Sequence, residues 1–168
     1  MAGPNTQQAA EYQGSFLSEV FGAMPMANQD AIVGEQTLSI REPVFWNRVF
    51  AFHPDAEKNL QAWQKALAGV YSIYPHRLDR DSGQPIRFFG GAEKPSGKRA
   101  LLAGFKSGDH EHPGLIFREL EKGRAAWVGF AGSWLWKTRQ ATQGRGSDLY
   151  DAFWEGVISW VSKEAGRE

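Results

Sequence analysis

Residues 133–160 read SWLWKTRQATQGRGSDLYDAFWEGVISW and carry the clearest structural signal in the chain. This stretch holds four of the seven tryptophans, namely Trp134, Trp136, Trp154 and Trp160. The apolar spacing of its second half predicts a long helix, capped by Ser147 and running to about Lys163. One broad apolar stripe follows that helix, made of Leu149, Phe153, Trp154, Val157, Trp160 and Val161. We therefore expect this helix to close the core of the domain.

The composition is that of a globular protein without a strong charge bias. Hydrophobic residues make up 42% and charged residues 23% of the 168 positions, which is unlike a disordered chain. Basic and acidic residues number 19 each, so we expect neither nucleic acid nor an anionic membrane surface as a partner. The sequence contains no cysteine, which excludes disulfides, thiolate metal ligands and a cysteine nucleophile.

The sequence predicts a single domain preceded by a polar tail. Residues 1–13 are polar and are expected to be flexible, and residues 14–168 are expected to form the domain. The start of the chain lacks the features of a signal peptide. No apolar run approaches the roughly 20 residues that a membrane-spanning helix needs. We therefore expect a soluble chain without direct membrane insertion.

The first half of the domain mixes helical and strand-like patterns. Apolar spacing over 14–24 predicts a short helix. From 37 to 52 the pattern changes toward period two, which predicts two edge strands separated by Pro43. A helix is then predicted from an N-cap at Asp55 to a C-cap at Gly69.

The later part of the domain is predicted to be rich in strands. Strands are expected at VYSIYP (70–75), RALLAGF (99–105) and LIFREL (115–120), and in the most apolar segment, RAAWVGFAG (124–132). The segment KSGDHEHPG (106–114) reads as the loop between two of them. The strands around RALLAGF (99–105) and AWVGFAG (126–132) are apolar enough to be central in a sheet and buried on both faces.

The acidic and histidine residues of that loop are weak candidates for a metal site. They are Asp109, His110, Glu111 and His112, and a His-x-His pair on a strand would project both rings to one side. Here Gly108 and Pro113 predict a turning backbone, and no distant third ligand is evident. We interpret the segment as a solvated hairpin loop and expect no metal or other cofactor.

The candidate ligand site is the aromatic and polar segment before the last helix. In an extended segment Trp134 and Trp136 would face the same side and form an aromatic floor for a sugar or a peptide. Arg139, Arg145 and Asp148 would supply polar contacts. In the alternative interpretation the rings pack under the last helix while Arg139 pairs with Asp148, and burial is the more common fate of aromatic residues. Most tryptophans are then core, with Trp134 and Trp136 the candidates for exposure.

The end of the chain carries a series of short motifs in a fixed order. They are Gly123-Arg124 before the apolar strand, Trp134 and Trp136 after it, Asp148 and Tyr150 at the helix start, and Phe153-Trp154 within the helix. This series resembles the end of the glutamine amidotransferase-like domains of large bacterial envelope proteins, which accompany von Willebrand factor A-like domains. A looser resemblance extends over residues 11–163. It implies a reduced flavodoxin-like α/β sheet with added antiparallel strands and a long C-terminal helix.

The sequence departs from that family at the catalytic positions. Class I amidotransferases use a cysteine nucleophile and a His-x-Glu pair, whereas this chain has no cysteine and no histidine after His112. Because the glutaminase triad is absent, the resemblance implies a non-catalytic binding or scaffold module of a cell-envelope assembly. The alternative is a sugar-binding or sugar-processing domain of the trehalose-utilisation type, which would use the loop from Trp134 to Asp148.

The first half of the family domain has no counterpart in this chain. Its absence is expected to leave an apolar strand edge or face open, and open edges recruit other chains. We therefore expect a homodimer, or a complex with a protein partner, that completes the sheet. In the alternative interpretation residues 1–36 fold back as a cover.

Overall fold

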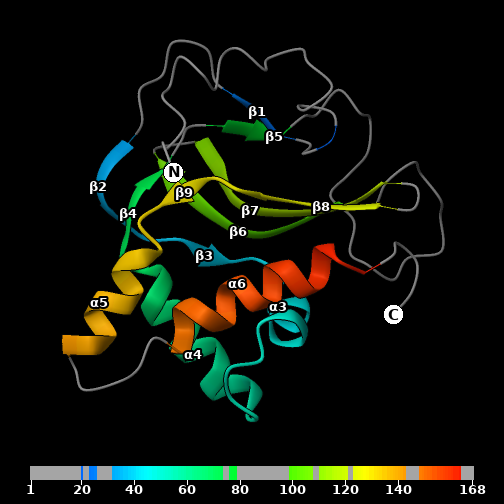
Figure 1. The fold of residues 1–168 in the computed structure, drawn as a ribbon. Coiled ribbons are helices and arrows are strands. Elements are labelled where there is room, and N and C mark those ends of the chain that lie inside the picture. Colours follow the sequence, from blue (N-terminus) through cyan, green and yellow to red (C-terminus); the bar gives the residue numbers. More distant parts are fainter. Residues whose placement is uncertain are drawn as a thin grey trace.

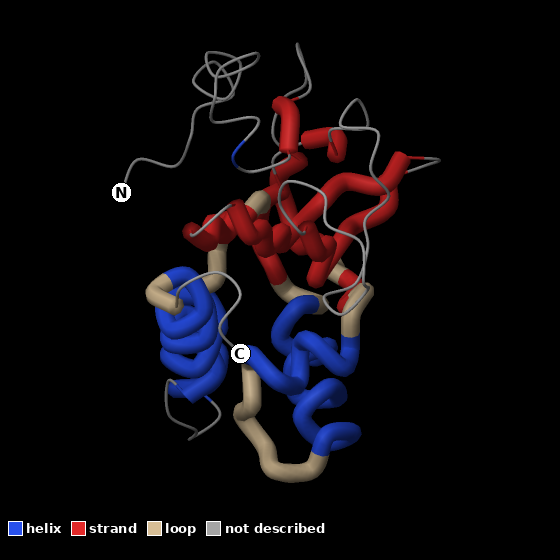
Figure 2. Tube along the Cα trace, turned by 90° about the vertical axis from the view of Figure 1, so that its right-hand side faces the viewer, coloured by secondary structure: helices blue, strands red, loops and turns tan. Residues whose placement is uncertain are grey.

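The computed structural model is mixed α/β, with helices gathered on one side of antiparallel strands (Figures 1 and 2). The described residues are 20, 23–25, 32–73, 76–78, 99–107, 110–120, 123–142 and 148–163. The predicted tail over 1–13 lies outside them, and so does nearly all of the predicted helix over 14–24. The last two positions of that predicted helix, Ala23 and Met24, belong instead to strand β1 (Ala23–Pro25).

Four strands form the largest sheet. They are β3 (Ser39–Ile40), β6 (Arg99–Ser107), β7 (His110–Leu120) and β8 (Gly123–Val128), in the order β3-β6-β7-β8. The strands predicted at 99–105 and 115–120 are confirmed, but β7 begins five residues earlier than expected. Residues 110–114 were predicted to be loop but belong to β7, where 110–113 pair with β6, so the loop assignment was wrong for them. The single strand predicted over 124–132 was wrong in its extent, because β8 ends at Val128 and residues 130–131 belong to another sheet.

Two smaller sheets complete the strand arrangement. One has the order β2-β4-β9, with β2 at Ile32–Gln36, β4 at Val70–Ile73 and β9 at Phe130–Ala131. The other pairs β1 with β5 (His76–Leu78). Every pairing between described strands is antiparallel. The α/β class is therefore confirmed, whereas the parallel strands of a flavodoxin-like sheet are not seen among the described pairings.

Helix α3 (Pro43–Val49) replaces the second of the two edge strands predicted over 37–52. Proline at the first helical position costs no hydrogen bond, and its fixed φ suits the start of a helix. Pro43 thus begins an element here instead of separating two strands. The helix buries Phe45 and Trp46, which are adjacent in sequence. Two adjacent apolar residues fit neither the helix period nor the strand period better, so the sequence pattern could not distinguish a helix from a strand here.

Helix α4 (Ala56–Leu67) confirms the helix predicted between Asp55 and Gly69. The Asp55 side chain caps its start, because it accepts a hydrogen bond of 2.9 Å from the backbone N–H of Lys58. The inward stripe includes Trp63 and Leu67, which are both fully buried. The C-cap is Ala68, one residue before the predicted glycine.

A buried asparagine fixes the connection between α3 and α4. The Asn59 side chain accepts hydrogen bonds from the backbone N–H groups of Phe52 (2.8 Å) and His53 (3.0 Å). Its amide donates to the carbonyl of Phe50 (2.9 Å) and to the side chain of Asn47 (2.7 Å). Since buried polar groups need such partners, Asn59 is a structural residue, and the sequence analysis did not identify it.

Helices α5 (Trp134–Thr142) and α6 (Asp148–Val161) follow the last strand. The long C-terminal helix is confirmed, although its predicted cap, Ser147, lies outside the described residues. The predicted apolar stripe faces inward: Phe153, Val157 and Trp160 are buried, and Leu149, Trp154 and Val161 are half-buried. Gly156 allows α6 to approach α3 closely, because a Cβ atom there would lie 2.6 Å from the Phe50 ring and 2.9 Å from the Val49 carbonyl oxygen.

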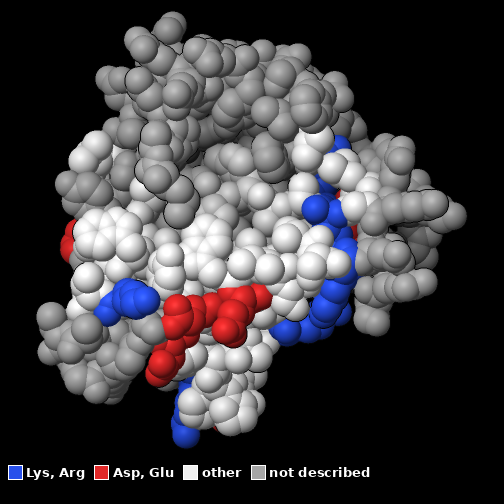
Figure 3. Space-filling view, viewed as in Figure 1, with Lys and Arg blue, Asp and Glu red and all other residues white. Residues whose placement is uncertain are grey.

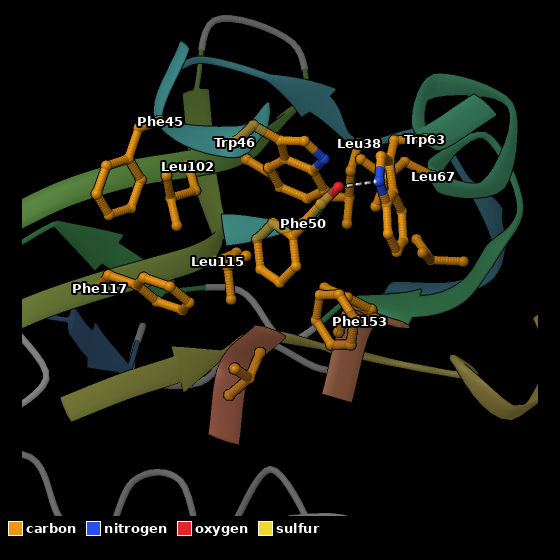
Figure 4. Close-up of a cluster of buried hydrophobic side chains, with 14 of the residues drawn as sticks. Leu38, Phe45, Trp46, Phe50, Trp63, Leu67, Leu102, Leu115, Phe117 and Phe153 are labelled. Carbon is orange, nitrogen blue, oxygen red and sulfur yellow. Dashed lines mark hydrogen bonds between the residues drawn. The ribbon is translucent and has the colours of Figure 1, made fainter. Parts of the chain in front are cut away.

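Aromatic rings fill the space between the helices and the sheet (Figure 4). Phe50 stacks on Phe153, with ring centroids 5.4 Å apart and an interplanar angle of 11°. The Trp46 ring also contacts Phe50, with their ring centroids 4.6 Å apart. The Trp63 indole N–H donates a 2.8 Å hydrogen bond to the Phe50 carbonyl, which satisfies one polar group inside the apolar core.

The opposite face of the large sheet is also buried. Leu101, Ile116 and Trp127 are neighbours across β6, β7 and β8 and are 6%, 0% and 9% exposed. Strand β5 packs against β7. The expectation of burial on both faces is confirmed for β6, but it was wrong for β8, which lies at the edge of the sheet and is mostly half-buried. An open edge or face was expected, and among the described strands only the outer edge of β8 is open in the large sheet beside the two-residue β3. Since β1 pairs with β5, the early part of the chain contributes to this side, in line with the alternative interpretation.

The end of α6 is joined to the β7–β8 hairpin by a stack of side chains. Trp160 stacks on Phe117, with ring centroids 4.2 Å apart. The Arg124 guanidinium also lies over the Trp160 ring, 5.0 Å from its centroid. Arg124 also donates to Glu119, with an Nη2–Oε1 distance of 2.8 Å. The positive charge of Arg124 is thus neutralised by its cross-strand neighbour.

Candidate functional site

The two tryptophans of the candidate ligand site lie on helix α5 and point in different directions. Gly132, with φ of 87°, ends the preceding strand segment in a conformation that favours glycine. The chain then turns directly into the helix, where residues two apart are rotated by roughly 200°. Trp134 is 59% exposed and Trp136 is 2% exposed. The prediction that both rings share one side was wrong, because it assumed an extended segment.

Trp136 belongs to the aromatic core. Its ring centroid lies 5.3 Å from that of Phe153, 5.9 Å from Phe130 and 6.2 Å from Trp63. These contacts come from three different elements. The interpretation in which the ring packs under the last helix therefore holds for Trp136, and this residue is unavailable to a ligand.

Trp134 remains as an exposed aromatic residue with polar neighbours. Lys137 lies three residues later on α5, so the two side chains are neighbours on the helix surface. The Lys137 ammonium group lies 5.8 Å from the centroid of the Tyr150 ring, which is near the start of α6. The structure thus brings together an indole, an ammonium and a phenol from both helices. The contribution of Lys137 and Tyr150 could have been anticipated only by knowing that both segments are helical.

The acidic member of the predicted site is on the same helix as Tyr150, two residues before it. Asp148 is the first residue of α6 and is exposed. A carboxylate at this position also interacts favourably with the helix dipole. Of the predicted basic members, the Arg139 side chain and the whole of Arg145 lie outside the described residues. The pairing of Arg139 with Asp148 therefore stays a prediction.

Two further carboxylates extend the acidic surface along α6. Asp151 and Glu155 are exposed and follow Asp148 on the outward side of the helix. The acidic side chains form a continuous patch in front of α6 (Figure 3). The surface next to this patch, over β8 and β9, is uncharged. The spacing of three and then four residues would have predicted this patch from the sequence.

The weak metal candidates are not assembled into a site by the residues that the structure describes. His110 and His112 lie on β7, and Asp109 is outside the described part of the chain. His112 is 4% exposed, and its ring stacks on Phe105 at 6.0 Å. Within the described ranges no group of three or more histidine, aspartate or glutamate residues could hold a metal ion.

The chemistry offered by the described α5–α6 surface is that of binding. An exposed indole can stack on a sugar or an apolar side chain, while the ammonium group can donate hydrogen bonds and the carboxylates can accept them. None of the helices in the described ranges combines the length and the apolar character needed to cross a membrane. Comparison of the chain with models of protein families, with characterised proteins and with solved structures finds no match.

Proposed function

We propose that the chain is a non-catalytic binding or scaffold module that engages its ligand through the α5–α6 surface. The observation that carries this proposal is the contrast between Trp134, 59% exposed beside Lys137 and Tyr150, and the closed aromatic core beneath it. A large exposed ring loses contact with water when a ligand covers it, which favours association. The neighbouring ammonium and carboxylate groups would orient that ligand.

The polar groups of the interior support a structural role for the core. Among the described residues the buried polar side chains are Asn59 and His112. Asn59 makes four hydrogen bonds that hold the α3–α4 connection, and His112 stacks on Phe105. The sequence also lacks any cysteine. The late-motif resemblance to amidotransferase-like envelope domains supports a place in a cell-envelope assembly and a distant relation to the flavodoxin-like fold.

A carbohydrate ligand is the second candidate, and the exposure of the Trp134 ring favours it. Sugar rings present a face of C–H groups that stacks on an indole, while their hydroxyl groups need charged or polar partners at the edge. Lys137, three residues after Trp134 on α5, and Asp148, at the start of α6, would be the partners of these hydroxyl groups. A peptide with an aromatic or aliphatic side chain would use the same indole.

The experiment combines an activity measurement with a binding measurement. Purified protein should release no ammonia from glutamine above a heat-inactivated control. Titration with a panel of neutral oligosaccharides, and separately with apolar and aromatic tripeptides, should change tryptophan fluorescence for at least one ligand class. Trp134→Ala should weaken that binding by roughly tenfold or more, the effect of losing one stacked contact of about 1.5 kcal/mol.

The control variant is Val44→Ala on α3, because Val44 is 86% exposed and lies on a different element. This substitution should leave the affinity unchanged. Glutamine hydrolysis by the native protein would contradict the non-catalytic proposal. Ligand binding that is unaffected by Trp134→Ala would contradict the assignment to the α5–α6 surface.

A further inference from the structure

The exposed edges of the described sheets differ in how they are protected against pairing with another chain. Strand β2 is interrupted by a register shift between Val33 and Gln36, and Gly34 within it has φ of 111°. Such bulges twist an edge away from a new partner strand. Strands β3 and β9, at the edges of their sheets, are only two residues long. These edges offer little to an added strand.

Strand β8 lacks these protective features. Its six residues pair with β7 in one continuous register from Leu115↔Val128 to Leu120↔Gly123. The strand GRAAWV contains no proline or lysine, and its one charged residue, Arg124, forms an ion pair with Glu119 of β7. Most of its residues are half-exposed, whereas residues 112–117 of the neighbouring β7 are all buried. Among the described residues, no strand pairs with the outer side of β8.

The register identifies the backbone groups that β8 presents at its edge. The N–H of Gly129, just after β8, donates a 2.9 Å hydrogen bond to the carbonyl of Gly114. In an antiparallel ladder, hydrogen-bonded pairs alternate with non-hydrogen-bonded pairs. Counting back from Gly129, residues 127, 125 and 123 direct their backbone groups toward β7. The N–H and C=O groups of Arg124, Ala126 and Val128 therefore point outward.

We propose that the β8 edge binds the β8 edge of a second copy of this chain, antiparallel and about a twofold axis at Ala126. In this register Ala126 faces its own counterpart, and Arg124 faces Val128 of the other copy. Each of these outward-pointing residues would then exchange both of its backbone hydrogen bonds. If the twofold axis passed through Ala125 instead, the outward-pointing backbone groups of Val128 would face no residue in β8 of the other copy. The register centred on Ala126 thus satisfies the most outward-pointing groups.

The side chains of β8 are compatible with a copy of the same strand. Alanine at the twofold position is small, so the α6 helices that cover this face meet no bulky group there. On the other face Trp127 of one copy would lie opposite Ala125 of the other, which places a large residue against a small one. A twofold interface uses the same surface on both copies, so that surface must be complementary to itself, and β8 meets this requirement.

The charges also favour a second copy as the partner. Arg124 already pairs with Glu119 within its own chain, at 2.8 Å. In the proposed register the two Arg124 residues lie about four residues apart along the strands, or roughly 14 Å, which is beyond the screening length in physiological salt. The formal net charge of the chain is zero. Two copies therefore meet without bulk electrostatic repulsion.

This inference deepens the proposed scaffold function by naming a partner, but it uses a surface other than the ligand site at Trp134. The two proposals can therefore fail separately. A dimer that lacks ligand binding would retain the β8 interface, and a monomer that binds a ligand through Trp134 would retain the proposed module function.

The first experiment compares proline at two adjacent positions. Ala126→Pro removes an N–H that points outward, so the ladder to β7 stays intact and proline is tolerated. Ala125→Pro is the matched control, because it removes an N–H that points toward β7 and should lower the unfolding temperature. Analytical ultracentrifugation of the native protein should show a dimer. In Ala126→Pro the dissociation constant should rise roughly tenfold to a hundredfold, while the circular dichroism spectrum stays unchanged.

A second experiment uses the absence of cysteine from the natural sequence. In the proposed register the two Cα atoms at position 126 would lie about 5.5 Å apart, a distance that a disulfide can span. Mild oxidation of Ala126→Cys should therefore give a covalent dimer. Val33→Cys on the bulged β2 edge, where Val33 is 66% exposed, should not. A native protein that stays monomeric at about 100 μM, or a dimer unaffected by Ala126→Pro, would overturn the proposal.

Discussion

The inward and outward sides of α5 and α6 use the same residue types for different purposes. Inside, Trp136, Phe153 and Trp160 pack into a continuous aromatic core. Outside, Trp134 and Ile158 are 59% and 60% exposed, and carboxylates lie beside them. Trp134 and Trp136 are only two residues apart, so the helical phase alone decides which ring is structural. Counting aromatic residues in a segment therefore says little about a ligand site until the backbone conformation is known.

The largest expected difference between the two sides is in stability. Phe153→Ala should lower the free energy of unfolding by about 3–5 kcal/mol, because a fully buried ring that contacts Phe50 and Trp136 leaves a cavity. Ile158→Ala, five residues later on the outward side, should change it by less than about 0.5 kcal/mol. Urea unfolding followed by circular dichroism measures both. Equal losses would mean that the outward side of α6 is covered by another part of the chain.

The half-buried neighbour Trp154 refines the same comparison. The sequence places both Phe153 and Trp154 in the apolar stripe of the last helix, but in the structure Phe153 is fully buried and Trp154 is half-buried, with the two ring centroids 5.2 Å apart. Trp154→Ala should therefore cost less than Phe153→Ala, although tryptophan is the larger residue. A larger loss at Trp154 would contradict the structure at this point.

An intermediate effect is expected from adding a single methyl group inside the helix contact. Gly156→Ala should lower the free energy of unfolding by about 1–2 kcal/mol. The new Cβ atom would lie 2.6 Å from the buried Phe50 ring, and this strain exceeds the gain in helix propensity of about 1 kcal/mol. Ser159→Ala, on the exposed side, should instead be neutral or slightly stabilising. If the inward and outward sides are assigned correctly, the thermal unfolding temperature should fall for Gly156→Ala and stay the same or rise slightly for Ser159→Ala.

The smallest effect on stability is expected at the candidate ligand site. Trp134→Ala should change the free energy of unfolding by less than about 0.5 kcal/mol, because the exposed ring contributes little to the core. Chemical denaturation monitored by circular dichroism avoids the change in fluorescence that removal of a tryptophan causes. A loss above about 2 kcal/mol would show that Trp134 is structural, and the binding proposal would lose its main residue.

Strong local signals made several elements predictable from the sequence. The Asp55 cap and the stripe containing Trp63 predicted α4, and the apolar stripe of α6 predicted its buried face. Those patterns repeat over three or more turns, so helix and strand periods diverge clearly. The α3 segment is only seven residues long, and its period is ambiguous over that length. Proline at its first position was the signal that favours a helix.

The candidate site was less predictable because it depends on long-range geometry. The interpretation of Trp134 and Trp136 required the local conformation, which Gly132 sets by turning the chain into α5. The proximity of Lys137 to Tyr150 depends on how α5 meets α6. Likewise, β5 packs against β7 although the two strands lie far apart in sequence. Such contacts leave no periodic trace in a single sequence.

The hydrogen bonds of Asn59 bear on the order in which the chain folds. Its partners lie only 6 to 12 residues away, at His53, Phe52, Phe50 and Asn47. By contrast, β3 must find β6 across the long segment between Ile40 and Ala103. Closing a short loop costs less chain entropy than closing a long one. The helix pair α3–α4 can therefore assemble before the large sheet, and the sheet would then form on a surface that already exposes Phe50 and Trp63.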